Sequence, residues 1–156
     1  MIVISIDPGK NKTGIAVVCN VQGDISHRVV KTENAPNYII ACKNDYPESP
    51  IICGDSTTSK DFVQRLRDFG VENEIIFVDE TKSSEEARML YWDRHRKPWY
   101  LFFLPSTMIV PKRSIDDYAA MIIARRYLKE INAITTNPMI KSRRKKRVRK
   151  ELEKKK

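Results

Sequence analysis

Acidic side chains stand at three places in the sequence where they could bind metal ions. Asp7 ends the apolar run Ile2–Ile6, and Glu80 closes a later apolar run in the same way. Asp116 and Asp117 open an apolar helical stretch. A charge at the end of a buried strand is costly unless a partner stabilises it, and neighbouring acids repel unless a hard cation such as Mg²⁺ or Mn²⁺ lies between them. A pair of such ions stabilises the attacking and leaving oxygens of phosphodiester hydrolysis, so these residue types indicate metal-dependent nuclease chemistry.

Each of these acids also has an ordinary structural interpretation. An Asp at the end of a strand often forms a turn, and an Asp at the start of a helix interacts favourably with the helix dipole. Asp117 stands three residues after Ser114, where a helix-capping acid belongs. Asp79 and Glu80 are neighbours on an extended chain, so only one of them can face a given site. The helical spacing leaves both Asp116 and Asp117 as candidates, because apolar residues line the helix face under each.

The elements that would position these acids form an α/β pattern. The chain opens with three predicted strands joined by tight turns, which indicates an antiparallel meander whose first turn displays Asp7. After it, predicted helices and strands alternate, which favours crossover connections and parallel strands in a mixed sheet. The predicted strands are 2–6, 14–19, 26–32, 50–54 and 74–78, and the predicted helices are 37–44, 58–69, 83–94 and 115–131.

Residues 97–113 show no clear helical or strand period. The part over residues 98–104, here called the aromatic segment, contains Trp99 and Tyr100 and is followed by Pro105. It could pack on the body of the protein or belong to a surface that faces the substrate. Trp99 and Tyr100 could stack on unpaired bases, but packing in the core is the commoner role of such side chains.

The net charge of the chain is concentrated at its C-terminus. The whole chain carries a formal charge of +9, and residues 141–156 alone hold eleven Lys or Arg and two Glu, so the remainder is formally neutral. A block of like charge cannot build a core and favours attraction to a phosphate backbone. We therefore predict one domain over residues 1–138 and a basic, flexible tail over residues 139–156 whose partner is a nucleic acid. A purely solubilising tail is the alternative.

Other features exclude several classes of protein. No apolar run is long enough to cross a membrane, and the first residues read as a strand rather than a signal peptide, so we expect a cytoplasmic protein without a membrane partner. Cys19, Cys42 and Cys53 are widely spaced, which favours free buried thiols over a zinc site. His27 and His95 lack metal-ligand spacing, and we expect both to be surface or packed residues.

Three stretches, in this order, resemble motifs of the RuvC and YqgF (RuvX) families. Ile4–Ala16, which reads ISIDPGKNKTGIA, is similar to the opening motif of both, an Asp-x-Gly turn followed by a strand that begins with Gly. Val78–Ala87, VDETKSSEEA, resembles the YqgF motif in which an Asp-Glu pair at a strand end precedes a helix containing Glu-Ala. Ile115–Ile123, IDDYAAMII, is similar to that family's final motif, an Asp entering a helix rich in Ala and Ile.

The resemblance implies a ribonuclease H-like fold. This is an α/β fold with a mixed five-stranded sheet, an antiparallel meander followed by parallel strands, flanked by helices. The resemblance also implies that Asp7, Glu80 and Asp116 are the catalytic carboxylates and bind Mg²⁺ or Mn²⁺, with Asp117 as the alternative to Asp116. In this fold the first and fourth strands and the last helix bring the acids together.

Loop residues add further candidates. Lys10, Lys12 and Thr13 lie in or beside the first turn and could contact a scissile phosphate, although lysines exposed to solvent are common. Asp55 stands in the stretch Gly54–Thr57, where the family usually has a Gly-Leu-Pro-type loop. It could be an additional acid near the site, but a polar loop residue is the commoner role.

The implied function is a metal-dependent endonuclease that acts on structured nucleic acid. Known activities of the superfamily include Holliday-junction resolution, and YqgF members are linked to maturation of the 5′ end of 16S ribosomal RNA. Branched DNA and structured RNA are therefore both candidate substrates, reached through the acidic face and the basic tail 141–156. A homodimer would suit a junction resolvase, because two symmetric nicks call for two symmetric sites. The alternative is a non-catalytic nucleic-acid-binding module with the same fold.

Overall fold

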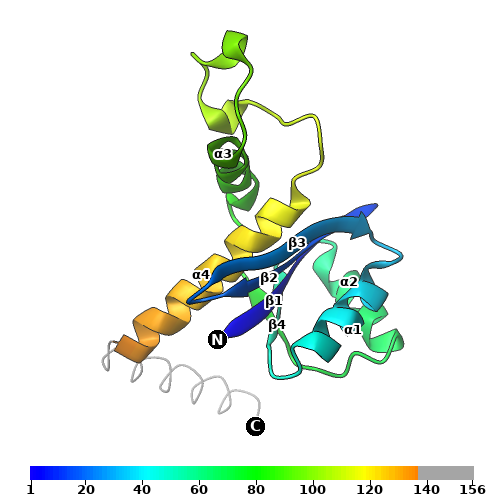
Figure 1. Cartoon of the computed structure of the whole chain (residues 1–156). Coiled ribbons are helices and arrows are strands. Elements are labelled where there is room, and N and C mark those ends of the chain that lie inside the picture. The colour runs from blue at the N-terminus through cyan, green and yellow to red at the C-terminus, as the bar shows by residue number, and fades with distance from the viewer. Residues whose placement is uncertain (137–156) are drawn as a thin grey trace, which may run out of the picture. The chain divides into compact units, whose positions relative to one another are not determined.

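The computed structural model describes residues 1–136 of the chain. Within these residues the helices and strands follow the order, and closely the positions, that the sequence predicts (Figure 1). Two short 3-10 turns lie between the last two helices, at Trp99–Leu101 and Ser106–Met108. The strands are β1 (Ile2–Pro8), β2 (Lys12–Cys19), β3 (Gly23–Lys31), β4 (Ile51–Gly54) and β5 (Ile75–Val78), and the α-helices are α1 (Ala35–Asp45), α2 (Ser59–Asp68), α3 (Ser83–Arg94) and α4 (Asp116–Thr136).

The strands form one sheet with the order β3-β2-β1-β4-β5. β2 pairs antiparallel with both β1 and β3, whereas β4 pairs in parallel with both β1 and β5. The tight turns after β1 and β2 produce the antiparallel part, and the crossovers through α1 and α2 produce the parallel part. This is the ribonuclease H-like mixed sheet that the sequence predicts, so the predicted fold class is confirmed.

Helices α1 and α2 cover one face of the sheet. Successive side chains of a strand point to opposite faces, so Ile4 and Ile6 of β1 lie on this face and Asp7 lies on the other. The buried cluster on this face consists of Ile4, Ile6, Ile15, Val17, Ala35, Ile39, Cys42, Ile51, Cys53, Phe62, Leu66, Val71 and Ile75. A register slip of one residue would move these side chains to the wrong face, so their burial fixes the direction in which Asp7 points.

The first part of α4, residues 116–125, lies on the opposite face of the sheet (Figure 1). Its side chains Ala119, Ala120, Met121, Ile123 and Ala124 are all buried. At Gly14 of β2 the helix comes so close that an added Cβ would overlap the backbone of Asp116. A glycine at this position is therefore needed to hold the first turn of α4 against the sheet.

The described residues belong to two compact units. Residues Met1–Arg125 form the first, which contains the whole sheet, and the second begins at Arg126. The described part of the second unit, residues 126–136, is the helical continuation of α4. The predicted domain boundary at residue 138 and the predicted basic tail lie outside the described residues. Among the described helices, none combines the length and the apolar character needed to span a membrane.

Exposed aromatic side chains distinguish the connection between α3 and α4. Trp99 is 84% exposed and Tyr100 is 54% exposed, so the expectation that they pack in the core is wrong. The physical reason is local: Pro98 and Pro105 interrupt regular structure, and Ser83 and Ala87 are the fully buried residues that α3 offers as a packing surface. The expectation of free, buried cysteines is confirmed for Cys19, Cys42 and Cys53.

Candidate active site

The three predicted acids stand at the ends of elements that meet at one edge of the sheet. β1, β4 and β5 are parallel neighbours, so their carboxyl ends lie at the same edge. Asp7 lies near the end of β1, and Glu80 follows the end of β5 by two residues. Asp116 is the first residue of α4 and lies against Gly14, which is the cross-strand partner of Asp7. The topology therefore brings together acids that are far apart in the sequence.

Asp7 is the electrostatic centre of this group. Burial and, after it, the negative charges of Glu80 and Asp116 raise the pKa of the Asp7 carboxyl from 3.8 to about 7. Like charges at short range disfavour ionisation, so the shift places Asp7 within electrostatic reach of both Glu80 and Asp116. Near neutral pH this carboxyl is therefore partly protonated, and a nearby cation would favour the ionised form.

Glu80 fits into a recess over Gly54. Its Oε2 atom is buried and has no hydrogen-bond partner. A Cβ on Gly54 would clash with this oxygen and would lie 2.9 Å from Cδ1 of Ile123 on α4, so glycine is the residue that leaves room. Burial raises the pKa of Glu80, and the charges of Asp55 and Asp79 add to the effect. A buried carboxylate oxygen without a partner is costly, and a bound cation would remove that cost.

The neighbouring Asp79 is used differently. Its carboxylate accepts hydrogen bonds from the backbone N–H of Thr81 at 2.9 Å and from the Thr81 hydroxyl at 2.6 Å. It is therefore an exposed turn residue, and Glu80 is the member of the pair that lies over Gly54. This agrees with the alternation of an extended chain, which allows one of two neighbours to face the site.

Asp55 is an acid of this edge to which the sequence assigned an ordinary loop role. It follows β4 directly, and its backbone N–H donates to the carbonyl of Val78 at 3.0 Å. Its side chain is exposed, and its charge raises the pKa of Glu80. The sheet topology could have identified Asp55. Because β4 is parallel to β1 and β5, the residue that follows β4 lies at the same end of the sheet as the ends of those strands.

Asp116 presents its carboxylate at the start of α4. The hydroxyl of Ser114 donates to Oδ2 of Asp116 at 2.6 Å, which orients the side chain. Asp116 is half-buried, and its charge is one of the two that raise the pKa of Asp7. Of the two acids that open this helix, Asp116 is thus the one placed with Asp7.

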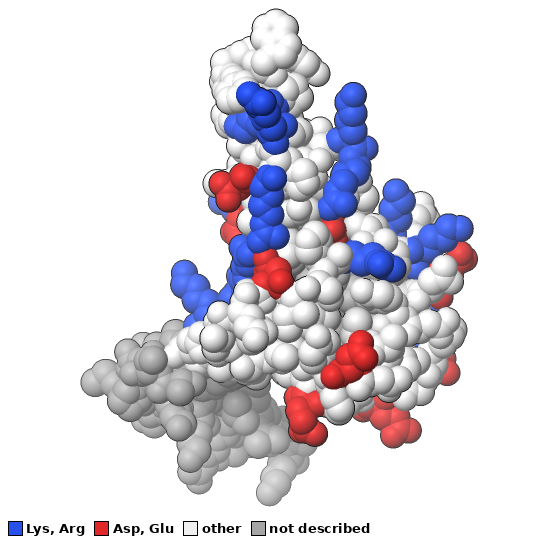
Figure 2. Space-filling view, viewed as in Figure 1, with Lys and Arg blue, Asp and Glu red and all other residues white. Residues whose placement is uncertain are grey.

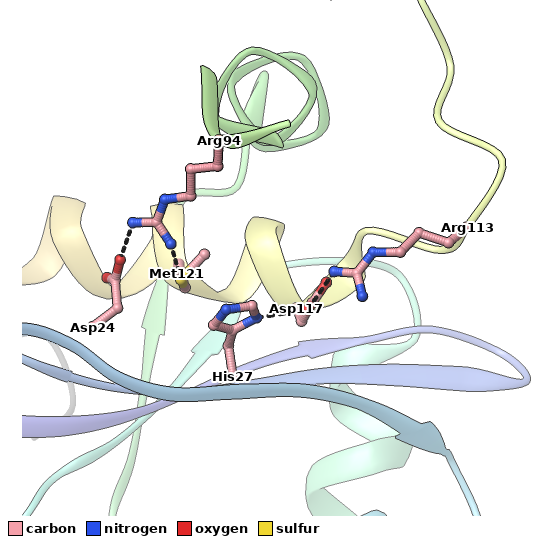
Figure 3. A network of polar contacts seen from close by, with 6 residues as sticks. All are labelled: Asp24, His27, Arg94, Arg113, Asp117 and Met121. Atoms are coloured by element: carbon pink, nitrogen blue, oxygen red, sulfur yellow. Dashed lines mark hydrogen bonds and ion pairs between the residues drawn. The ribbon is translucent and has the colours of Figure 1, made fainter. Parts of the chain in front are cut away.

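Asp117 points instead into a polar network with β3 (Figure 3). Its Oδ2 atom accepts a hydrogen bond from Arg113 at 2.8 Å and lies 2.7 Å from Nδ1 of His27. Its side chain is almost completely buried. The capping role expected for Asp117 is replaced by this network, which ties β3 to the start of α4. His27 packs edge-on against Tyr118, in agreement with its expected role as a packed residue.

A second polar contact in the same view holds α3 in place (Figure 3). Asp24 of β3 accepts hydrogen bonds from Arg94, the last residue of α3, and from Arg125 of α4, the latter at 2.7 Å. The carboxylate of Asp24 is largely buried. Asp24 thus ties the end of α3 to β3 and α4.

The remaining candidates, Lys10, Lys12 and Thr13, lie in or beside the turn between β1 and β2 and differ in exposure. Lys10 and Lys12 are exposed, whereas Thr13 is buried. The hydroxyl of Thr13 lies 3.0 Å from that of Thr32, and Thr32 donates to the carbonyl of Gly9 at 2.9 Å. Thr13 therefore stabilises the turn and does not lie with the acids, while the two lysines extend from it.

A groove rich in positive charge runs beside the start of α4, and we call it the basic groove. Its volume is about 470 Å³. Four Lys or Arg side chains and one Asp are among its lining residues, so its charge favours an anionic ligand. The lining residues are Lys12, His27, Arg28, Val29, Val30, Lys31, Arg113, Ser114 and Asp117.

The carboxylates of Asp7, Glu80 and Asp116 are suitable ligands for a hard divalent cation, although they do not converge on a single point. Over residues 1–136, no group of three or more His, Cys, Asp or Glu stands ready to hold a metal ion. The unpartnered Oε2 of Glu80 and the raised pKa of Asp7 are nevertheless the features that a cation would relieve. Mg²⁺ and Mn²⁺ prefer carboxylate oxygens, which Asp7, Glu80 and Asp116 supply.

Comparison with known proteins gives structural likeness but no likeness in sequence. No protein-family model matches the chain, and no curated protein matches it in sequence. Among solved structures, the chain is similar to the structure of RuvC from Thermus thermophilus, with 14% sequence identity and a TM-score of 0.48 over 81% of this chain and 94% of that chain. The order and directions of the strands, rather than this likeness, define the fold.

Proposed function

We propose that this chain is a metal-dependent endonuclease that hydrolyses phosphodiester bonds in structured nucleic acid. The observation that carries the proposal is the position of the half-buried Asp7 beside Glu80 and Asp116, whose charges add to burial in raising its pKa. Asp24 and Asp117, whose side chains are largely buried, are each paired with arginine. Asp7 faces further acids instead, an arrangement that is unfavourable for folding and characteristic of metal-binding catalytic sites.

Each residue of the site has a definite role in this proposal. Asp7, Glu80 and Asp116 would hold Mg²⁺ or Mn²⁺. The chemistry that such ions supply when bound is activation of the attacking water and stabilisation of the leaving oxygen. The recess over Gly54 fixes Glu80 and the hydroxyl of Ser114 orients Asp116, so the carboxylates are positioned before a substrate arrives.

The positive side chains nearby would position the substrate. Lys12 and Arg113 line the basic groove beside the start of α4, and Lys10 extends from the same turn as Lys12. Contacts to phosphates fix the register of a nucleic acid but carry no sequence information. This arrangement supports recognition by backbone and shape, and not a strict base sequence.

The motifs suggest two classes of structured substrate. The opening motif around Asp7 is closer to RuvC and favours a four-way DNA junction, for which a homodimer with two sites would be suitable. The Asp79-Glu80 motif is closer to YqgF and favours a precursor of 16S ribosomal RNA. We propose a cytoplasmic location for the protein.

A binding module without catalysis is the second candidate. Two observations favour it: the basic groove offers a phosphate-binding surface, and the acids do not yet form a three-ligand group. Such a module would bind nucleic acid with a steep dependence on salt concentration, and removing the Asp7 charge would not reduce its affinity.

The decisive experiment measures cleavage by the full chain. A labelled four-way DNA junction and a structured ribosomal RNA precursor are incubated with Mg²⁺ or Mn²⁺ and with wild type, Asp7→Asn or Asp45→Asn. Asp45 ends α1, which lies on the opposite face of the sheet, so its variant controls for the loss of one negative charge. We expect cleavage of one substrate that requires the metal, is lost in Asp7→Asn and persists in Asp45→Asn.

The opposite outcome is equally clear. If wild type cuts neither substrate, and binds both tightly and salt-dependently whether or not Asp7 is replaced, the chain is a binding module. Cleavage that persists in Asp7→Asn at the wild-type rate would mean that the reaction does not use these carboxylates.

A further inference from the structure

The connection between α3 and α4 presents large apolar side chains to solvent. Trp99 and Phe103 are 84% and 81% exposed, and Phe102 and Met108 are more than half exposed. Figure 1 shows this connection extending beyond the end of α3, away from the sheet. Burying such side chains is worth about 1.5–3 kcal/mol each, so a cluster left in solvent indicates a surface that binds a partner.

Hydrogen bonds anchor this connection to α3. Arg88 donates to the carbonyl of Thr107 at 2.9 Å, and the indole N–H of Trp92 donates to the carbonyl of Ile109 at 2.9 Å. Ile109 itself is buried. The part of the connection that leads back toward α4 is therefore fixed at Thr107 and Ile109. The aromatic segment is held next to α3 while its side chains stay exposed.

The chain that carries the aromatic segment is basic, although Glu86 and Asp93 of α3 line a pocket together with its Lys97 and Ser106. Residues 95–113 contain four Lys or Arg and no Asp or Glu. Figure 2 shows an uncharged surface at the far end of the connection, with both positive and negative side chains closer to the sheet. Aromatic side chains combined with neighbouring positive charge are the combination by which proteins bind single-stranded nucleic acid, through base stacking and phosphate contacts.

This surface also leads into the candidate active site. The connection ends at Lys112 and Arg113, and Arg113 lines the basic groove together with Lys12 and Lys31. Asp116 follows three residues later, and at the other end α3 begins three residues after Glu80. The aromatic segment therefore lies on the stretch of chain that joins two of the three carboxylates.

We propose that the aromatic segment binds unpaired bases of a nucleic acid whose phosphates lie in the basic groove. Trp99 and Phe103 stack on bases that have left the duplex, at a junction, loop or single-stranded end. The inference rests on the proposed nuclease function and specifies its substrate: a nucleic acid with unpaired bases next to the cleaved bond. Stacking does not depend on base identity, so the segment selects structure and not sequence.

The basic residues on both sides of the segment, and the basic groove that Arg113 lines, are what favour nucleic acid as the occupant. A second copy of this chain would bring the same positive charge against itself, which is unfavourable near the aromatic side chains. An anionic membrane would also attract aromatic and basic residues, but it would give no reason for the surface to continue into a groove lined by Arg113 beside Asp116.

The test compares two fluorescent probes in EDTA, so that binding is measured without cleavage. One probe is a fully paired duplex, and the other has the same sequence with an unpaired loop of several bases. Fluorescence anisotropy gives the dissociation constant of the full chain and of the double variant Trp99→Ala/Phe103→Ala for each probe. We expect wild type to prefer the looped probe, and the double variant to lose about ten-fold or more of its affinity for that probe but less than about two-fold for the duplex.

Two control variants make the comparison specific. Phe69→Ala removes an exposed aromatic side chain at the end of α2, away from the segment, and should change neither affinity. Trp99→Phe retains a stacking surface and should retain most of the preference for the looped probe. Melting temperatures close to that of wild type are expected for all variants, because the replaced side chains are exposed.

The alternatives give different results. A double variant that binds both probes like wild type would overturn the inference and leave the proposed nuclease function intact. The same binding result together with a wild-type dimer that the double variant cannot form, in analytical ultracentrifugation, would assign the surface to a second copy. Loss of binding only to phosphatidylglycerol vesicles would assign it to a membrane. If wild type binds neither probe, the inference fails, and the proposed function is then decided separately by the cleavage assay.

Discussion

The backbone of Asp116 lies directly over Gly14, with no space between them for a side-chain carbon. Gly14 is at the same time the cross-strand partner of Asp7. One glycine therefore stands between two of the proposed metal-binding acids and sets how closely the strand and the helix approach. The consequence is that the geometry of the site depends on a residue with no chemistry of its own.

Gly14→Ala tests this dependence. The added methyl group must push the start of α4 away from β2, and overpacking of this kind costs about 1–3 kcal/mol. We expect a chain that still folds, with lower stability to urea and with cleavage reduced more than ten-fold because Asp116 has moved from Asp7. Wild-type activity in Gly14→Ala would show that this contact does not position the acids.

The raised pKa of Asp7 predicts how stability changes with pH. Its pKa is about 7 in the folded protein, against 3.8 as the ordinary value. Between these pH values the folded state binds a proton that the unfolded state has lost, so the wild type loses stability as pH rises from about 4 to about 7. Asp7→Asn carries no charge and lacks this loss.

Urea unfolding in EDTA at pH 4, 6 and 8 measures the effect. We expect Asp7→Asn to be more stable than wild type at pH 8 by at least about 1 kcal/mol, since each unit of pKa shift corresponds to about 1.4 kcal/mol, and the difference should disappear at pH 4. Mg²⁺ should stabilise wild type and not the variant. Parallel pH profiles of wild type and Asp7→Asn would contradict the raised pKa.

Asp116→Asn and Asp117→Asn should have opposite effects on stability and cleavage, although the residues are adjacent. Asp117 binds Arg113 and His27 while almost completely buried, so its replacement should cost about 2 kcal/mol of stability. Asp116 is held by Ser114 alone among the contacts described above, and its replacement should abolish cleavage with little loss of stability. Thermal unfolding and the cleavage assay distinguish the two. An Asp117→Asn enzyme that is stable and inactive would move the third ligand to Asp117.

Gly54→Ala should disturb Glu80 in a way that a second change can partly repair. The new methyl group would clash with Oε2 of Glu80 and lie 2.9 Å from Cδ1 of Ile123. We expect weaker Mg²⁺ binding and a loss of stability of about 1–3 kcal/mol. Ile123→Val removes one of the two crowded groups, so the double variant should recover part of the stability. A double variant no better than Gly54→Ala would show that Ile123 is not part of the recess.

The sequence was sufficient to predict the sheet and most of the helices, because their signals are local. The apolar runs around Ile4, Ile15 and Ile51 became buried strands, and the tight turn at Gly9 produced the first antiparallel pair. The helix predicted over residues 37–44 starts two residues earlier in the structure, at Ala35, because Pro36 is tolerated in the first turn of a helix.

The arrangement of the site required the structure. Helical spacing could not choose between Asp116 and Asp117, because the choice depends on Arg113 and His27, which approach from a loop and from β3. The association of Asp55 with Glu80 likewise depends on the parallel pairing of β4 with β5. The exposure of Trp99 was not predictable from composition, because an apolar aromatic run has the same appearance in a core and on a binding surface.

The insertion of the α3–α4 connection between Glu80 and Asp116 has a further consequence for how such a protein can change. Side chains of the aromatic segment bury little surface, so substitutions there should alter stability by less than about 0.5 kcal/mol each. The sheet and its carboxylates, by contrast, tolerate almost no added volume at Gly14 or Gly54. Natural variation and laboratory engineering can therefore remodel this connection and retain the chemistry, and exchanging it between related proteins offers a direct route to new substrate preferences.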